Sequence, residues 1–312
     1  MKLKPIIYGL LSFIPGVENL RRSFQKTGGT CSSRYCYSVW LRHLVMADKA
    51  GLNTCPAVVA ELGPGDSLGI GLMALLTGSE KLYAFDVINF TSTNNNLEVF
   101  DELIILLKGK EKIPDDVEFP RIKPYLDDYT FPKHILNDER LEESLSDLNI
   151  EKIRNAISQI NTPKNIIQYK VPWFEDGVLQ KESVDMIFSQ AVLEHVDDLD
   201  GTYSSMKKWL KPDGFISHQI DFKCHATATE WNGHWAYSDF MWFIIRGRRA
   251  FHLNRETCSI HLKKITDVGF KVLVEIPVVA PSNLTKNDLP KHYKDVPESD
   301  MTISGLFIQC SN

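Results

Sequence analysis

The chain has 312 residues, of which 43% are hydrophobic and 24% charged, so it can bury a sizeable core in one large domain or in one domain with inserts. Its formal net charge of -5 at pH 7 argues against a general nucleic-acid-binding protein, which would carry a basic excess. The six cysteines show no Cys-x-x-Cys pair and no zinc spacing, so we expect reduced thiols in a cytoplasmic protein.

The N-terminus combines two lysines with an apolar stretch. Lys2 and Lys4 precede the run from Pro5 to Pro15, which is too short to span a bilayer and has no small-residue cleavage site after it. The favoured interpretation is a helix docked on the protein core. The alternative is a peripheral contact between residues 1–15 and the inner face of the membrane.

Strand and helix signals then alternate along the chain, which predicts a mainly parallel sheet with helices on both faces. Strands are expected at residues 57–62, 81–87, 165–171, 184–189, 214–221, 270–279 and 304–310. Helices are expected at residues 68–76, 97–107, 198–210 and 255–267, the last ended by Gly269 in a left-handed conformation. Two segments exceed this alternation: residues 108–164, interpreted as an added helical layer, and the aromatic insert 222–254.

A glycine turn follows the first expected strand. Gly63 and Gly65 let the backbone pass close to a ligand, and the next helix presents free N–H groups to a polar tail. A phosphate loop would need Gly-Lys-Ser/Thr at its end, and the dinucleotide fingerprint needs a third glycine where Leu68 stands. Asp86 ends the second strand, where a carboxylate can accept bonds from two ribose hydroxyls. The pattern therefore favours a nucleoside ligand.

Four motifs stand in a characteristic order between residues 57 and 221. They are Glu61 before the Gly63-Pro64-Gly65 turn, Asp86, Gln190-Ala191-Val192-Leu193-Glu194-His195-Val196, and Leu210-Lys211-Pro212-Asp213-Gly214. In this order they resemble the motifs of class I S-adenosylmethionine-dependent methyltransferases. The resemblance implies an α/β fold: a doubly wound, mainly parallel, seven-stranded Rossmann-like sheet with helical inserts, ending in an antiparallel hairpin.

The same resemblance implies S-adenosylmethionine as the cofactor. Glu61 would face its methionine end and Asp86 its ribose. The other cofactor residues would come from the ends of neighbouring strands: Gly63, Gly65, Gln190 and Val171. No acid stands clearly after the strand at 165–171, where many relatives contact the adenine, so backbone and aromatic groups would serve there instead.

Three stretches resemble a narrower group, the methyltransferases of bacterial surface-polysaccharide and O-antigen pathways. They are Ser32 to Leu44, Glu61 to Gly78, and Asn254-Arg255. In that group residues 1–56 would form a helical segment over the cofactor site, and residues 57–312 would form the methyltransferase domain. Arg34 and Tyr35 would be candidates for the cofactor's carboxylate and for a lid, with ordinary surface packing as the alternative.

Methyl transfer to a hydroxyl is an in-line displacement that a general base assists, and histidine suits this role near neutral pH. His218, beside Asp221, and His195 are the candidate catalytic residues, with His218 slightly preferred. Some sugar, quinone-pathway and RNA-end methyltransferases bind a divalent ion through Glu-x-x-Glu-His. The stretch from Gln190 to His195 lacks one of these acids, so no metal is predicted.

The acceptor is predicted from the second insert. Aromatic faces and guanidinium groups suit a sugar or an anion, and the candidate residues are His225, Trp231, His234, Arg246 and Arg248. We expect both inserts to line the acceptor cleft and the enzyme to methylate a sugar hydroxyl of a saccharide or glycan precursor. The alternatives are a methyltransferase for a small lipid, quinone or other metabolite, and a non-catalytic binding protein. The sequence leaves the oligomeric state open.

Overall fold

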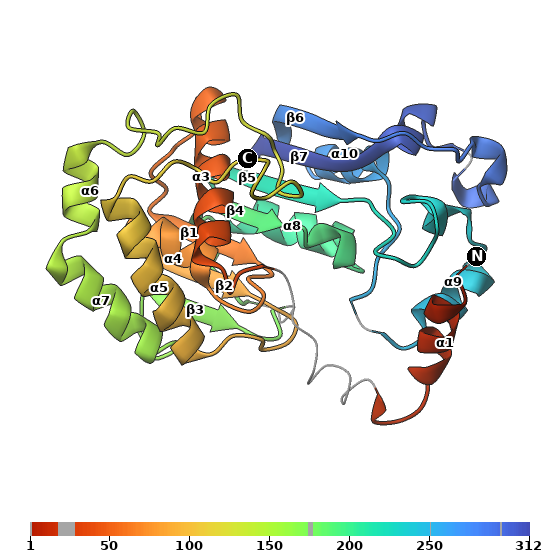
Figure 1. Ribbon diagram of the computed structural model, residues 1–312, viewed down its shortest axis with the longest axis horizontal. Coiled ribbons are helices and arrows are strands. Elements are labelled where there is room, and N and C mark those ends of the chain that lie inside the picture. Colours follow the sequence, from red (N-terminus) through yellow and green to blue (C-terminus); the bar gives the residue numbers. More distant parts are fainter. Residues whose placement is uncertain (1, 18–28, 174–176, 250, 294) are drawn as a thin grey trace.

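A seven-stranded sheet forms the centre of the computed structural model, which describes residues 2–17, 29–173, 177–249, 251–293 and 295–312 (Figure 1). The strands are β1 (Val58–Leu62), β2 (Lys81–Phe85), β3 (Ile167–Lys170), β4 (Val184–Gln190), β5 (Leu210–Asp221), β6 (Lys271–Val279) and β7 (Ile303–Ser311). Their order is β3-β2-β1-β4-β5-β7-β6, and β7 alone runs antiparallel to its neighbours. The predicted strands, the terminal hairpin and the doubly wound α/β class are confirmed.

Helices cover both faces of this sheet. The helices of the described residues are α1 (Leu3–Leu11), α3 (Ser33–Lys49), α4 (Gly69–Leu76), α5 (Thr93–Lys108), α6 (Asp138–Ser144), α7 (Asp147–Ser158), α8 (Leu199–Trp209), α9 (Asp239–Arg246) and α10 (Cys258–Asp267), of which α1 and α9 lie away from the sheet (Figure 1). The four predicted helices are confirmed as α4, α5, α8 and α10, and Gly269 ends α10 with φ +90°. Leu210, predicted as a helix end, instead begins β5.

Each face of the sheet has its own hydrophobic core, because successive strand residues point to opposite sides. Val59 of β1 faces the core that includes α3, α4 and α5, whereas Ala60 faces the core that includes α8 and α10. On β4, Phe188 faces the core that includes α3, and Ile187 faces the core that includes α8. The central strands are therefore buried on both sides, which explains their continuous apolar runs.

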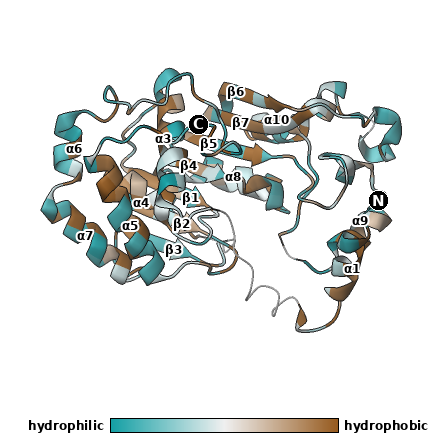
Figure 2. Ribbon diagram, in the orientation of Figure 1, coloured by the Kyte–Doolittle hydropathy of each residue, from teal (hydrophilic) through white to brown (hydrophobic). Residues whose placement is uncertain are grey.

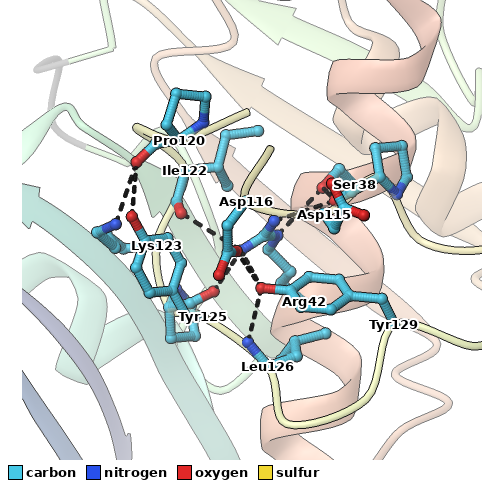
Figure 3. A network of polar contacts seen from close by, with 12 residues as sticks. Ser38, Arg42, Asp115, Asp116, Pro120, Ile122, Lys123, Tyr125, Leu126 and Tyr129 are labelled. Atoms are coloured by element: carbon cyan, nitrogen blue, oxygen red, sulfur yellow. Dashed lines mark hydrogen bonds and ion pairs between the residues drawn. The ribbon is translucent and has the colours of Figure 1, made fainter. Parts of the chain in front are cut away.

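One buried cation fastens the first insert to α3. Arg42 is completely buried, and its guanidinium donates to the carbonyl oxygens of Pro114, Ile122 and Pro124 at 3.0, 3.3 and 2.6 Å (Figure 3). Its Nη1 also lies 3.5 Å from a carboxylate oxygen of Asp116. Because an unpaired buried guanidinium is costly, these contacts hold the loop between α5 and α6 in place.

The N-terminal segment predicted over residues 1–56 is described except for residues 1 and 18–28, and it splits into two parts. Helix α3 is part of the core, and Ser32 caps its start by accepting a bond from the Tyr35 N–H. Helix α1 packs against α9 near the opposite end of the molecule from α6 and α7 (Figure 1). Within the described residues no helix is long and apolar enough to cross a membrane, and the six cysteines are all free thiols.

Candidate active site

A cleft of about 960 Å³ lies at the carboxyl ends of β1, β2 and β4, large enough for a nucleoside-sized ligand. It brings together three regions of the sequence: the turn with Gly63 and Gly65, Asp86, and the stretch with Gln190 and His195. We call this the main cleft. Side chains from the N-terminal segment and the second insert complete its lining, among them Lys2, Leu3, Lys4, Pro5, Tyr8, Tyr35, His225, Arg249 and Phe251.

The glycine turn needs its glycines. Gly63 and Gly65 have φ values of +65° and +73°, in the left-handed region that side chains rarely adopt. A Cβ atom at Gly63 would also lie 2.6 Å from a methyl group of Val192. The Gly63 N–H donates to the Phe85 carbonyl at 2.7 Å, which joins the turn to the end of β2. The backbone itself therefore forms this wall of the cleft.

Asp86 lies at the end of β2 with its carboxylate largely buried. Its Oδ1 accepts a bond from the Val87 N–H at 2.7 Å. Burial raises the pKa of this carboxyl to about 6, against the opposing effect of backbone N–H donors. Asp86 is therefore mostly ionised at neutral pH and can accept hydrogen bonds from a ligand in the cleft.

Two other predicted cofactor residues do not line the main cleft. Glu61 points beneath the turn, where its Oε2 accepts a bond from the Gly71 N–H at 3.0 Å, and burial raises its pKa to about 8. Val171 follows β3 and packs against the core that includes α3. The contribution of Glu61 in this structure is to join β1 to α4 under the glycine turn.

Gln190 lines the cleft and is held by a residue that the sequence analysis did not single out. Its Oε1 lies 3.4 Å from Nε2 of His43 on α3, and its Nε2 donates to Gln219 at 3.3 Å. His43 is fully buried, with Nδ1 2.6 Å from the Ser217 hydroxyl, and burial lowers its pKa to about 4. No local sequence signal could have found this pair, because 147 positions separate Gln190 from His43.

His218 lies inside the sheet and does not line the cleft. It is fully buried, its Nδ1 lies 2.8 Å from the Ser189 hydroxyl, and burial lowers its pKa to about 3. Asp221 pairs instead with Lys223 and His225, at 3.3 and 3.5 Å. The predicted pairing of Asp221 with His218 is not formed, because residues three apart on a strand point to opposite faces.

His195 occupies the position that the sequence analysis ranked second, and it lines the main cleft. It ends the short helix η1 (Leu193–His195) after β4, and Asn254 holds this turn by donating to the carbonyls of Leu193 and Val196 at 2.7 and 2.9 Å. Its Nδ1 has no hydrogen-bond partner. Burial lowers its pKa to about 4, so the imidazole is neutral at pH 7 and also a weaker base than a free histidine.

Two further ionisable groups surround His195. Ligand atoms of Glu194, His195 and His225 lie within 4.8 Å of one another, the one group in the described part of the chain that has the donors and the geometry for a metal ion. Glu194 is buried with neither carboxylate oxygen hydrogen-bonded, and desolvation raises its pKa well above the usual range. The sequence analysis predicted no metal here; this grouping depends on His225, from the second insert.

The main cleft continues into a second hollow of about 750 Å³. Lys2, Tyr35, Gln190, Ala191, His225 and Ala226 line both. The second hollow adds Asp221 and Trp231, with Arg121 to Lys123 opposite. The two inserts thus each contribute a wall, although helices α6 and α7 of the first insert lie at the far end of the molecule (Figure 1).

Several predicted acceptor residues lie outside both hollows. His234 is buried against Trp235 with ring centroids 5.2 Å apart. Arg246 forms a two-pronged pair with Asp197 at 2.7 and 2.6 Å, and exposed Arg248 lies over the Phe13 ring. The one arginine of this cluster that lines the main cleft is Arg249, whose guanidinium also bonds carbonyl oxygens at the end of α9.

Arg34 and Tyr35, the two candidates from the N-terminal segment, also differ in whether they line the hollows. Arg34 forms an exposed ion pair with Glu118 at 2.6 Å and lines neither hollow. Tyr35 lines both hollows and packs edge-on against Phe119. Of the pair predicted to contact or cover the cofactor, Tyr35 alone therefore faces the cleft in this structure.

Comparisons with known proteins agree with this architecture. Residues 142–217, about a quarter of the chain, match the family model described as "Methyltransferase domain"; the segment runs from α6 into β5 and includes His195. No curated protein sequence matches the chain significantly.

Solved structures with similar folds include methyltransferases and a [4+2]-cyclase, all at low identity. A S-adenosylmethionine-dependent methyltransferase from Mesorhizobium loti is 12% identical over 86% of this chain and 98% of its own, with a TM-score of 0.42. A putative one from Listeria monocytogenes is 12% identical over 90% and 99%, with a TM-score of 0.43. A putative sarcosine dimethylglycine methyltransferase from Galdieria sulphuraria is 12% identical over 87% and 84%, with a TM-score of 0.45. Similarity this distant says nothing of the acceptor.

The family match covers the fourth strand and the turn that follows it, which end at the cleft. The mainly parallel, seven-stranded sheet with its terminal antiparallel hairpin agrees with what the family resemblance implied. The protein has a Rossmann-like α/β fold, and residues 142–217 within it are similar to a methyltransferase domain.

Proposed function

We propose that the protein methylates a hydroxyl group of a saccharide or glycan precursor in the main cleft. The observation that carries this proposal is that the glycine turn and Asp86 lie on one side of a single cleft that also contains His195. Donor recognition and proton acceptance are thus available at one place, as methyl transfer to a hydroxyl requires.

The donor side fits S-adenosylmethionine. Gly63 and Gly65 leave a cradle that any side chain at Gly63 would fill, and Asp86 offers a carboxylate to the ribose hydroxyls. Hydrogen bonds to a charged acceptor contribute roughly 1.5–3 kcal/mol. When bound, the cofactor supplies a methyl group on a sulfonium, which needs no acid catalysis to leave.

The acceptor side has its base in His195. Its neutral imidazole removes the proton of the acceptor hydroxyl as the oxygen forms its new bond to carbon, and the proton stays on the ring. We propose His195 in place of His218, because His218 is sealed inside the sheet.

The saccharide class is proposed from the second hollow. Its walls mix polar side chains with an aromatic ring: Gln219, Asp221, Lys223 and Trp231. Hydroxyl-rich ligands are bound by such combinations of hydrogen-bonding groups and flat apolar faces. Leu3, Pro5 and Tyr8 at the edge of the main cleft favour a second candidate, an acceptor that carries a lipid.

The test is to incubate the protein with S-adenosylmethionine labelled on its methyl group and with fractionated glycans and lipids from cells. Label is expected in a saccharide or lipid-linked saccharide fraction, and His195→Ala should abolish it without changing donor binding measured by calorimetry. Label confined to sugar-free lipids or small metabolites would refute the saccharide proposal. Absence of donor binding would refute the catalytic assignment itself.

A further inference from the structure

Helix α1 is tightly joined to α9 by one of its faces. The face that contains Pro5, Gly9 and Ser12 is buried there. Gly9 approaches α9 so closely that a Cβ atom would lie 1.9 Å from the Ile244 carbonyl oxygen. The Arg248 N–H donates to the Ser12 hydroxyl at 2.8 Å, across 236 positions of sequence. Helix α1 is therefore held in a defined orientation.

The opposite face of this helix pair is apolar and exposed. Eight of the fourteen exposed large hydrophobic side chains of the described residues belong to α1, α9 and the turn after α1. They are Leu3, Ile7, Tyr8, Leu10, Leu11, Ile14, Phe240 and Phe243. We call this set, except Tyr8, the α1–α9 face; Leu3 and Tyr8 both also line the main cleft. Figure 2 shows the hydrophobic turns of α1 and of the chain after it.

The spacing explains why these residues share one face. Leu3, Ile7 and Leu10 are three or four positions apart, so they form one stripe along α1, and exposed Ile14 follows in the turn after it. Phe13 joins the two helices, with its ring centroid 5.7 Å from that of Phe243. Monomeric proteins rarely leave so large an apolar patch in water without a partner.

The positive charges around the α1–α9 face favour a negatively charged binding partner. Between residues 2 and 17 the charged side chains are Lys2 and Lys4, both exposed, and exposed Arg248 lies over the Phe13 ring. Two copies of the same face would bring like charges together, whereas an anionic bilayer offers apolar depth and negative headgroups.

Two acids beside α9 are already paired with other cationic or imidazole groups. Asp197 is paired with Arg246 at 2.6 Å. Asp239, at the start of α9, lies 3.6 Å from Arg255 and 3.7 Å from His292. Among the described residues no ion pair joins Lys2, Lys4 or Arg248 to an acid, although Lys2 and Lys4 also line the main cleft.

We propose that the α1–α9 face docks on an anionic membrane surface, with the apolar stripe entering the interface and Lys2, Lys4 and Arg248 meeting the headgroups. The first turn of α1 also lines the main cleft, so docking brings the cleft to the membrane. An acceptor carried on a lipid would then reach the cleft without leaving the bilayer. The docking itself does not rest on the proposed function.

The experiment measures co-sedimentation of the full chain with vesicles of phosphatidylcholine, with and without phosphatidylglycerol, in the absence of methyl donor and acceptor. The wild type should sediment with the anionic vesicles, less at high salt. The double variant Ile7→Glu, Leu10→Glu should bind at least about tenfold more weakly, because each leucine-sized side chain withheld from the interface costs roughly that factor. Lys2→Gln, Lys4→Gln and Arg248→Gln together should remove the preference for phosphatidylglycerol.

The matched control is Ile105→Glu, Leu148→Glu, two equally simple changes of exposed apolar residues on α5 and α7. It should bind vesicles like the wild type. Thermal unfolding of both double variants checks that their folds are intact. The proposal is overturned if the wild type does not bind, if Ile7→Glu, Leu10→Glu binds equally well, or if ultracentrifugation shows a wild-type dimer that this variant dissociates.

Discussion

The two sides of the main cleft are built differently. The side that we propose for the donor consists of Gly63, Gly65 and Asp86, which belong to one β1-α4-β2 unit within a short stretch of sequence. The acceptor side combines His195 after β4 with His225 from the second insert and Tyr8 from α1. A local unit forms its geometry from its own backbone, whereas the acceptor side exists only once distant segments have packed together.

The largest effect is expected on the acceptor side. His195→Ala should lower kcat by roughly 10²–10⁴ while donor affinity stays nearly unchanged, as removal of a general base does. Because the pKa of His195 is about 4, wild-type kcat should be flat across neutral pH, and the residual rate of the variant should rise with pH as hydroxide replaces the base.

His218→Ala is the paired measurement, since the sequence analysis ranked His218 first. Its buried ring touches Ser189 and not the cleft, so the variant should lose stability but keep kcat in the folded fraction. Near-normal kcat in His195→Ala together with a large loss in His218→Ala would reverse our assignment.

The next effect concerns the donor side. Asp86→Ala should weaken S-adenosylmethionine binding by roughly 10–150-fold, the factor that corresponds to losing about 1.5–3 kcal/mol of charged hydrogen bonding. Isothermal calorimetry measures it, and Asp213→Ala, an exposed acid on β5, serves as control. Unchanged affinity in Asp86→Ala would show that the ribose does not lie at the end of β2.

A smaller effect, on stability, is expected for Glu61, which does not line the main cleft. Its pKa in the folded protein is about 8, against 4.5 ordinarily, so its neutral form stabilises the fold; this contribution is complete below pH 4.5 and is lost as pH rises through 8. Glu61→Gln should therefore be more stable than wild type above pH 8, by a few degrees in Tm or about 1–2 kcal/mol.

Calorimetric melting of wild type and Glu61→Gln over a pH series checks this difference. Donor affinity of the variant should stay within a few-fold of wild type, because Glu61 bonds the Gly71 N–H and does not line the cleft. A parallel pH dependence of Tm in the two proteins would contradict the raised pKa, and a large loss of donor affinity would make Glu61 a cofactor residue.

The smallest effect is expected from the arginines outside the cleft. Arg246→Ala and Arg248→Ala should leave the acceptor KM within about twofold, because Arg246 is paired with Asp197 and Arg248 is at the surface, where such charges contribute at most about 1 kcal/mol. Steady-state kinetics on the identified acceptor measures this. A many-fold increase in KM would instead support the prediction of the sequence analysis that Arg246 and Arg248 bind the acceptor.

The errors of the sequence analysis concern side-chain direction more than element position. β5 was predicted where it lies, yet His218 and Asp221 were expected to act together although their three-residue spacing puts them on opposite faces. Strand periodicity could have excluded that pair. No local sequence pattern indicates that Arg246 pairs with Asp197, which lies 49 positions away.

The strands, the glycine turn and the place of Asp86 after the second strand could be predicted from the sequence. These depend on apolar runs, on backbone angles that only glycine adopts readily, and on short motifs, all of which are local properties. The tertiary structure alone decided that Glu61 lies beneath the turn, that His195 rather than His218 lines the cleft, and that α1 pairs with α9. These depend on which distant segments pack together, and neighbouring residues do not encode that.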